Sequence, residues 1–323
     1  MPGKRYLSFV AKLVFSATLL ALVLFRIDTA DILTRIKGAD PRWLIAAFLA
    51  APLVILLSAW RWQVLSLGLL RFWEAVRYTW IGLFFGSILP GMVGGDVAKG
   101  VSLASKNPET RDARLPVSIG VDKLVGLWAL LFIFSLVGVK VLGTLPVPLA
   151  GFRKVLWLAL GTTGVGLVAG IMICQRKVAV VCEKSAKRIR VPFLRNLTLR
   201  LLAAITTYQG RGTRLVAALT LSFVLHAANA TIYWAVLHSL AIPASLAFAA
   251  IFYCLLSVLL SMPVSISGIG VRDAFSAALF GAYGLRPEAG VAFSWLLLVL
   301  GIPGVIVGGL IQVWEMFQRR RSH

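Results

Sequence analysis

Ionisable side chains follow a break in the apolar sequence at Leu89-Pro-Gly-Met-Val-Gly-Gly-Asp-Val-Ala-Lys99. Asp96 and Lys99 lie three residues apart, so a helix that begins near Gly95 would present both on one side. It would also hold Asp96 at its N-terminus, where the helix dipole favours an anion. Two readings stay open: a site for a charged headgroup, or a helix cap beside a lysine that extends towards water.

A second break, Ser261-Met-Pro-Val-Ser-Ile-Ser-Gly-Ile-Gly-Val-Arg-Asp273, also ends in a base and an acid. The guanidinium of Arg272 could hold a phosphate through two parallel hydrogen bonds. Alternatively it could pair internally with Asp96 or Asp122 and hold the two halves of the chain together. The order of charge is reversed between the breaks, so antiparallel halves could set unlike charges opposite one another. We therefore expect Asp96 within water-bridged reach of Arg272, and Asp122 near one of the two bases.

Asp122 and Lys123 lie inside the apolar run 115–139. A charge there costs about 2.5–3.5 kcal/mol unless it is paired or hydrated. These residues either line a polar cavity or pair with a partner on a broken segment. Ser87 and Ser267 either donate to a headgroup or satisfy helix backbone. Together with Asp96, Lys99, Arg272 and Asp273, these residues form the expected substrate-binding set.

The breaks themselves predict where the site lies. Proline removes a backbone donor and glycine tolerates positive φ, so an unbroken helix is not expected at either place. Broken backbone at membrane depth survives only where protein or a water-filled cavity satisfies it. Two such segments, one in each half, indicate a transporter binding site where they meet. The expected break residues are Pro90, Gly91, Gly94, Gly95, Pro263, Gly268 and Gly270.

Composition sets the class of protein. The chain of 323 residues is 59% hydrophobic and 14% charged, with a mean hydropathy of +0.89. These values are typical of an all-α polytopic membrane protein. The net charge of +21 sits in loops between apolar runs, which favours anionic lipid headgroups as partners over nucleic acid. The cysteines and histidines show no ligand spacing, so neither a metal nor a cofactor is expected.

Apolar runs of membrane-spanning length predict about eight crossings and a re-entrant hairpin at residues 78–98. The chain reads as a single transmembrane domain, 1–323, with halves at about 1–174 and 215–323. Residues 175–214 hold ten bases against one acid, which places this loop and both termini in the cytoplasm. Apolar residues at helical spacing within it predict an interfacial amphipathic helix. The expected crossings are 8–25, 43–60, 115–139, 155–174, 215–238, 244–262, 270–284 and 289–314.

Three stretches in order resemble the signatures of the lysylphosphatidylglycerol synthase transmembrane-region family. The first is residues 89–99, the second is Asp122-Lys-Leu-Val-Gly-Leu-Trp128, and the third is residues 263–275 with Tyr283-Gly-Leu285 after them. The chain departs from the usual family residues at Ser87, Lys99 and Asp273. The resemblance covers nearly the whole chain and implies a bacterial or archaeal integral membrane protein of the cytoplasmic membrane.

The resemblance also bears on activity. In the protein that gives the family its name, a separate soluble domain transfers the amino acid, and the membrane region is linked to moving the product between leaflets. This chain ends nine residues past its last expected span, so we expect no aminoacyl-transferase domain and no enzyme activity.

Three functional hypotheses follow. The first is a flippase or scramblase-like translocator that carries a phosphate-bearing headgroup in a polar cleft. The second is a membrane enzyme, or an accessory factor, acting on a lipid-linked substrate, although common enzyme motifs are missing from the sequence. The third is a scaffold that recruits a cytoplasmic partner through residues 175–214. The sequence leaves open the identity of the lipid and whether the chain forms a homo-oligomer.

Overall fold

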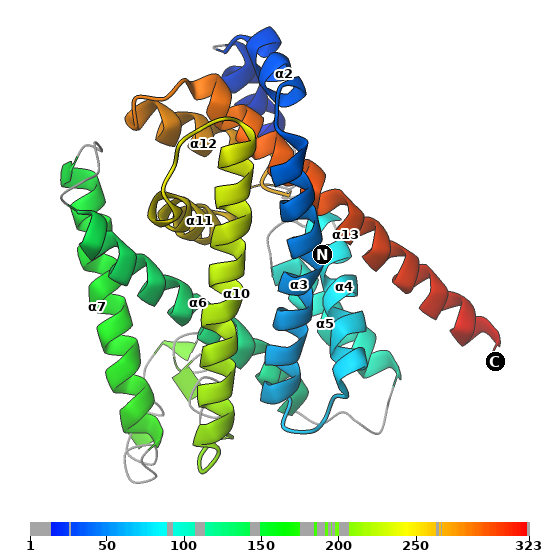
Figure 1. Cartoon of the computed structure of the whole chain (residues 1–323). Helices are drawn as coiled ribbons and strands as arrows, with labels where there is room; N and C mark the ends of the chain where they lie inside the picture. Colours follow the sequence, from blue (N-terminus) through cyan, green and yellow to red (C-terminus); the bar gives the residue numbers. More distant parts are fainter. Residues whose placement is uncertain are drawn as a thin grey trace.

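The chain is helical throughout the part that the structure describes (Figure 1). The computed structural model describes residues 14–25, 27–88, 93–106, 114–142, 149–174, 184–185, 191–192, 195, 198–199, 207–262, 265 and 267–321. Most of the expected amphipathic segment in 175–214, together with Pro90, Gly91 and Pro263, lies outside these residues.

The described helices confirm an all-α membrane protein. They are the helix Val14–Phe25, α2 (Thr29–Lys37), α3 (Pro41–Leu65), α4 (Phe72–Ile88), α5 (Val93–Lys106), α6 (Arg114–Val141), α7 (Leu149–Cys174), α10 (Gly212–Ser239), α11 (Leu246–Ser261), α12 (Val271–Ala282) and α13 (Pro287–Arg321). Among the described residues, α3, α6, α10 and α13 contain stretches long and apolar enough to cross a membrane. The protein is therefore polytopic, whereas the total of eight crossings stays a prediction.

Local sequence sets the helix starts. Asp40 caps α3 by accepting a hydrogen bond from the backbone N–H of Arg42, and Pro41 occupies the first turn. Asp28 caps α2 in the same way through Ala30. The expected crossings do not include α2, because this helix is too short and too polar to resemble a membrane span.

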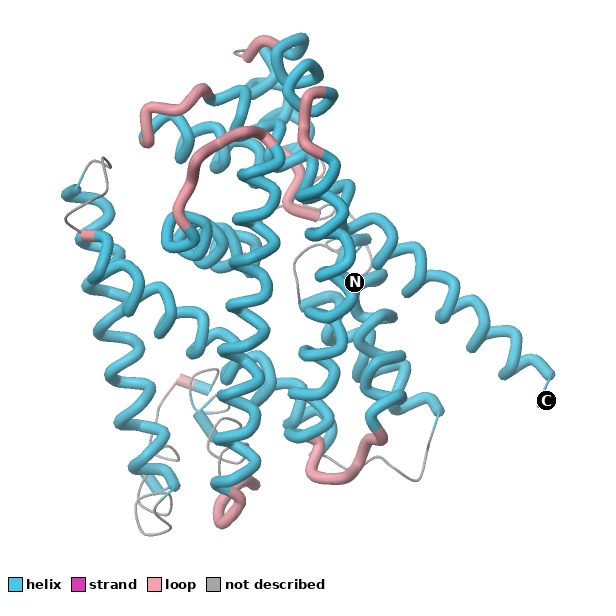
Figure 2. The backbone as a smooth tube through the Cα atoms, viewed as in Figure 1, coloured by secondary structure: helices cyan, strands magenta, loops and turns pink. Residues whose placement is uncertain are grey.

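The loops gather at two ends of the bundle (Figure 2). One end, here called the α2 end, carries α2 and the loops α10–α11 and α12–α13. The other, here called the basic end, carries the α3–α4 loop and the start of α10, with exposed Arg71, Arg211 and Arg214. At the basic end the hydroxyl of Tyr208 donates to the carbonyl of Leu65 at 2.5 Å. Burial raises the pKa of Tyr208 to about 12, so it stays protonated and joins the turn before α10 to α3.

Helices α4 and α5 form an antiparallel hairpin that enters from the basic end. Gly95 packs against Gly82 and Gly86 so closely that an added Cβ would lie 3.3 Å from the Cα of Gly86 and would contact the carbonyl of Gly82. One turn further along, the aliphatic part of Lys99 lies across Gly82. Gly94 and Gly95 therefore lie inside α5, and the expectation that they form part of the break is wrong for this reason. The small residues serve close helix packing instead.

Helices α11 and α12 form a second antiparallel pair, which enters from the α2 end. Phe248 contacts Tyr283 with ring centroids 4.3 Å apart, and Phe252 contacts Phe280 at 5.7 Å. The chain reverses between them through Gly268 and Gly270, with φ of +75° and +79°. Both glycines are part of the break, as predicted, because their positive φ disfavours other residues.

The tips of the two hairpins touch. The hydroxyl of Ser267 donates to the carbonyl of Ser87 at 2.5 Å. Since an α-helix rises about 1.5 Å per residue, α4, α5, α11 and α12 are only about 26, 21, 24 and 18 Å long. All four are shorter than the roughly 30 Å of a bilayer core. The prediction that the two broken segments meet is confirmed, and the meeting point is partly buried.

The first hairpin is held from outside by α13. Gly304 and Gly308, spaced four apart, let α13 lie directly on α4. A Cβ at Gly304 would lie 2.8 Å from Leu83, and a Cβ at Gly308 would contact the carbonyl of Trp80 and lie 3.0 Å from Phe84. The last helix of the chain thus covers the helix that leads to the first break.

Gly308→Ala tests this contact. We expect a lower unfolding temperature, with a loss of about 1–3 kcal/mol, because the added methyl group meets backbone that cannot move aside. Gly301→Ala on the same helix is the matched control, since nothing lies within 4 Å of its added Cβ. Thermal unfolding of both variants in detergent checks this, and equal unfolding temperatures would contradict the close approach.

Candidate functional site

An ion cluster lies at the seam between the first hairpin and α6. Asp96 on α5 contacts two lysines: Lys123 of α6, with Nζ 2.8 Å from its carboxylate, and Lys99 of α5, with Nζ 3.5 Å away. The cluster holds one more positive than negative charge. Of the two sequence readings, the structure shows that Lys123 pairs with a residue of the broken segment.

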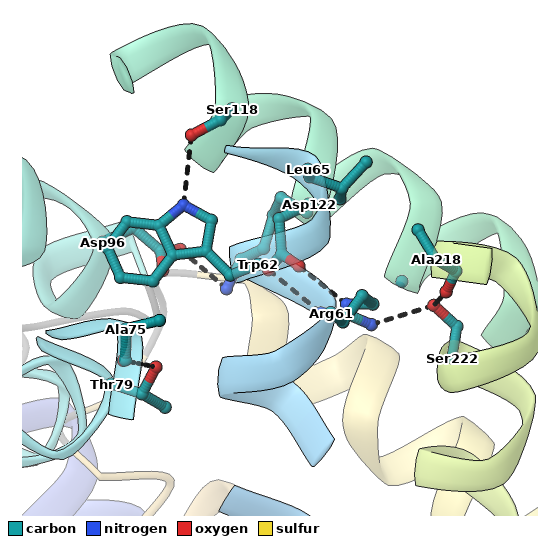
Figure 3. Close-up of polar contacts among 12 residues, drawn as sticks. Arg61, Trp62, Leu65, Ala75, Thr79, Asp96, Ser118, Asp122, Ala218 and Ser222 are labelled. Carbon is teal, nitrogen blue, oxygen red and sulfur yellow. Dashed lines mark hydrogen bonds and ion pairs between the residues drawn. The ribbon is translucent and has the colours of Figure 1, made fainter. Parts of the chain in front are cut away.

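Trp62 of α3 lies beneath this cluster (Figure 3). It is 2% exposed, and its indole N–H donates to the hydroxyl of Ser118 at 3.1 Å. The ammonium of Lys99 lies 5.4 Å from the centre of the indole ring, within the range of a cation–π interaction. Lys99 therefore has two stabilising contacts besides its hydrophobic stem.

Asp122 has a different partner from the one predicted. Its two carboxylate oxygens accept hydrogen bonds from Nε and Nη2 of Arg61 at 2.7 and 3.0 Å, while Nη1 of Arg61 donates to Ser222 at 3.1 Å (Figure 3). The expectation that Asp122 would lie beside one of the two bases of the breaks is thus corrected. Asp122 pairs with Arg61 because the guanidinium offers the bidentate geometry that a carboxylate prefers.

Gly126 makes room for this pair. A Cβ there would lie 2.8 Å from Nη1 of Arg61. The carbonyl of Gly126 also lies 2.9 Å from Nε2 of His226, whose Nδ1 lies 2.7 Å from the hydroxyl of Tyr253. Since a carbonyl only accepts, Nε2 donates and a neutral ring accepts from Tyr253 at Nδ1. His226 is thus a structural link between α6, α10 and α11.

Depth along the helices places the Arg61–Asp122 pair, and the ion cluster beside it, inside the bundle. Asp122 lies about 12 Å from the start of α6, and Ser222 about 15 Å from the start of α10, both measured from the basic end. Arg61 is 6% exposed, so the cluster is screened from water on this side. Charges at such depth are expected to be paired and functional.

The cluster opens towards the outside at Lys123. The side chain of Lys123 is 46% exposed, against 20% for Asp96 and 13% for Lys99. Apolar side chains near these residues along both helices are exposed: Val97 and Val101 on α5, and Leu124 and Leu127 on α6. A charged group could therefore reach the cluster from the side while apolar chains stay against the flanks.

Arg272 and Asp273 form a separate network near the α2 end. Asp273, 2% exposed, accepts hydrogen bonds from the backbone N–H of Gly270 at 2.9 Å and from the hydroxyl of Ser294 at 2.5 Å. The Nε of Arg272 donates to that same hydroxyl at 2.8 Å. Ser294 thus links the two charged side chains to α13.

Asp96 and Arg272 have different direct partners, and the direction of the hairpins explains this; water-bridged reach between them stays a prediction. Each hairpin enters from its own end, so the charged residues that follow each break lead away from the meeting point. Asp96 faces Lys123, whereas Arg272 faces Ser294. Of the expected set, only Ser87 and Ser267 meet across the two breaks, and the hydroxyl of Ser87 bonds within its own helix to Phe84.

Sequence reasoning missed Arg61 and Trp62. Both stand in a Trp-Arg-Trp run at the end of an apolar segment, which is typical of an interface anchor. A signal was present in Asp122, because a carboxylate inside a span requires a basic partner of similar depth. Among the described residues, groups of three His, Cys, Asp or Glu side chains that could hold a metal are not found.

The sequence matches one family model. It is described as the lysylphosphatidylglycerol synthase TM region, and the match covers residues 9–308. Neither the curated proteins nor the solved structures give a significant match. The match includes both broken segments, the ion cluster and the Arg272 network.

Asp122→Asn should lower the free energy of unfolding by about 3–5 kcal/mol, because it leaves the guanidinium of Arg61 buried without its counter-ion. The double variant Arg61→Met/Asp122→Leu should recover most of this loss, since it removes both charges together. Asp31→Asn, which alters the more exposed pair with Arg35, is the control and should cost less than about 1 kcal/mol. Unfolding in detergent is the measurement, and a double variant as unstable as the single one would argue against the pair.

Proposed function

Because the chain belongs to the lysylphosphatidylglycerol synthase transmembrane-region family, we propose that it moves a phosphate-bearing lipid between the leaflets of the cytoplasmic membrane. The observation that carries the proposal is the ion cluster of Asp96, Lys99 and Lys123. It lies at membrane depth, carries a surplus positive charge and opens sideways between apolar flanks.

The lengths of the helices support a revised topology. In it the chain crosses six times, through the segment that contains the helix Val14–Phe25 and through α3, α6, α7, α10 and α13. The hairpins α4–α5 and α11–α12 are re-entrant and approach from opposite faces, since each of their helices is too short to cross. Opposed half-helices that meet inside the bilayer are the arrangement that transporters use to build a substrate site at the midplane.

Charge explains how the site would accept a lipid. Asp96 acts as an internal anion that occupies both lysines when the lipid is absent. A lipid phosphate that enters beside Lys123 replaces the carboxylate of Asp96 as the partner of Lys123. Asp96 stays paired with Lys99, and it pairs with Lys123 again when the lipid leaves. Exchange of one anion for another keeps the lysines paired, so a free charge is not left in the bilayer at any stage.

The acyl chains need no protein channel. Val97, Val101, Leu124 and Leu127 continue the hydrocarbon surface up to the opening. The headgroup would therefore cross inside the protein while its chains stay in the bilayer. This division of labour lets a translocator act on the shared phosphate chemistry of many lipids.

Lys123→Gln should slow lipid movement roughly tenfold, the effect of losing one charge-assisted hydrogen bond of about 1.4 kcal/mol. Asp96→Asn should bind anionic lipid more tightly and also move it more slowly, since the competing carboxylate is gone. Lys37→Gln on α2, exposed and far from the cluster, is the control. The measurement is movement of fluorescent phosphatidylglycerol in vesicles that contain the full chain.

If the wild-type chain leaves the rate of movement unchanged for every anionic lipid tested, translocation is excluded, and turnover of a lipid-linked substrate becomes the better hypothesis.

The orientation can be tested separately. The basic loop before α10 and the C-terminus should lie in the cytoplasm, because cytoplasmic loops are enriched in lysine and arginine. In a chain without other cysteines, Arg211→Cys should react with an impermeant reagent only after the membrane is opened. Arg286→Cys, in the loop before α13, should react in intact cells. The reverse pattern would overturn the orientation.

A further inference from the structure

Arg272 is a buried cation with most of its hydrogen-bonding capacity unused. It is 8% exposed, and its Nε donates to Ser294 at 2.8 Å. Within the described part of the chain, neither Nη1 nor Nη2 has a hydrogen-bond partner. These two nitrogens carry four of the five N–H donors of a guanidinium.

The neighbouring Asp273 does not fill this role. Its carboxylate oxygens accept from Gly270 and Ser294, and it reaches Arg272 only through the Ser294 hydroxyl. Among the described residues, a carboxylate within ion-pair distance of the Arg272 guanidinium is not found. Asp273 thus balances the charge of Arg272 through the Ser294 hydroxyl and not by direct contact. Nη1 and Nη2 of the guanidinium stay open.

Arg61 provides the comparison within the same protein. It is buried to a similar extent, at 6% exposed, yet all three of its nitrogens donate: two to Asp122 and one to Ser222. An arginine with a purely structural role in this bundle is therefore fully paired. Arg272 departs from that pattern, because among the described residues only its Nε has a hydrogen-bond partner. Its two terminal nitrogens can therefore bind a ligand or water.

A second unsatisfied donor lies on the same face of α12. Ser276 follows Arg272 by one helical turn, is 0% exposed, and its hydroxyl has no hydrogen-bond partner. Ser222 of α10, which is also 0% exposed, instead donates to the carbonyl of Ala218 one turn before it. The free hydroxyl of Ser276 and the open edge of Arg272 thus form a pair of neighbouring donors.

We propose that this pair is a second anion-binding station, which receives the phosphate of the lipid after it leaves the Asp96 cluster. The planar fork of a guanidinium matches the oxygens of a phosphate, and a serine hydroxyl completes such a site. Arg272 follows the break of the second hairpin, where a Cβ added at Gly268 would lie 3.7 Å from the Cβ of Arg272. In the same break, Ser267 is bonded to Ser87 of the first hairpin. The station therefore adjoins the place where the hairpins meet.

Depth gives the station its part in the transfer. Arg272 lies about 15 Å along α12 from the α2 end, and Asp96 about 15 Å along α5 from the basic end. Each end of the bundle thus has its own cationic site, with the contact between Ser87 and Ser267 between them. The inference rests on the proposed translocation for its ligand, although binding at Arg272 can be measured without any movement of lipid.

The test is the rise in unfolding temperature that phosphatidylglycerol causes in the purified full chain in detergent. Arg272→Lys keeps the charge and loses the fork, so it should reduce this rise by at least about half. Arg272→Lys/Lys123→Gln should abolish it, since both stations are then impaired. Arg35→Lys on α2 is the matched control and should behave as wild type. Inorganic phosphate at the same concentration separates a free anion from a lipid.

Stability without lipid separates binding from structure. Arg61→Lys should lower the unfolding temperature in the absence of lipid, whereas Arg272→Lys should change it little, because only one of its hydrogen bonds is at stake. If Arg272→Lys lowers this temperature as Arg61→Lys does and keeps the full response to phosphatidylglycerol, Arg272 is structural and the station is refuted. If the response is lost while the wild-type chain moves no lipid, the station stands and translocation falls.

Discussion

A helix that stops inside a bilayer leaves carbonyl groups that hydrocarbon cannot satisfy, and the arrangement of this protein depends on how it meets that constraint. In the proposed topology two hairpins stop there, one from each end, and a hydrogen bond joins them. The hydroxyl of Ser267 donates a hydrogen bond to the carbonyl of Ser87 across the contact. Glycines in α5 and α13 allow the neighbouring backbones to approach closely enough to shield α4 on two sides. Contacts with protein therefore cover the helix that leads to the first break.

Electrostatics divides the bundle in the same way. Near the basic end, Arg61 and Asp122 neutralise one another and connect α3, α6 and α10 into a fixed frame. Asp96, Lys99 and Lys123 lie beside that frame but share a single carboxylate, so their pairing can be exchanged. Near the α2 end, Arg272 is anchored by one bond only. Fully paired charges give rigidity, whereas incompletely paired charges supply binding energy, and the two kinds lie within a few helical turns of each other.

Much of this could be read from the sequence. Apolar runs gave the helices, and the combination of proline, glycine and charge identified both broken segments and their contact. The direct partner of Arg272 was not predicted, because it depends on which end the second hairpin enters from. Sequence spacing suggested that α11 and α12 would be crossings, whereas their lengths in the structure, 16 and 12 residues, favour the re-entrant hairpin of the proposed topology. Arg61 was missed because an arginine between tryptophans reads as an interface anchor, until a carboxylate at equal depth is matched to it. Gly94 and Gly95 were misplaced because glycine marks both turns and tight helix packing.

The contact between the hairpins also sets an order of assembly. Ser87 and Ser267 are 180 residues apart, so the ribosome completes the first hairpin well before its partner exists. At roughly 5–20 residues per second, that interval lasts about 10–40 s. Throughout it, the tip of α4 and α5 sits without its later neighbour, and α13, which covers α4, is made last of all. The nascent chain must therefore keep this hairpin near the interface, or in the shelter of the insertion machinery, until the second half arrives.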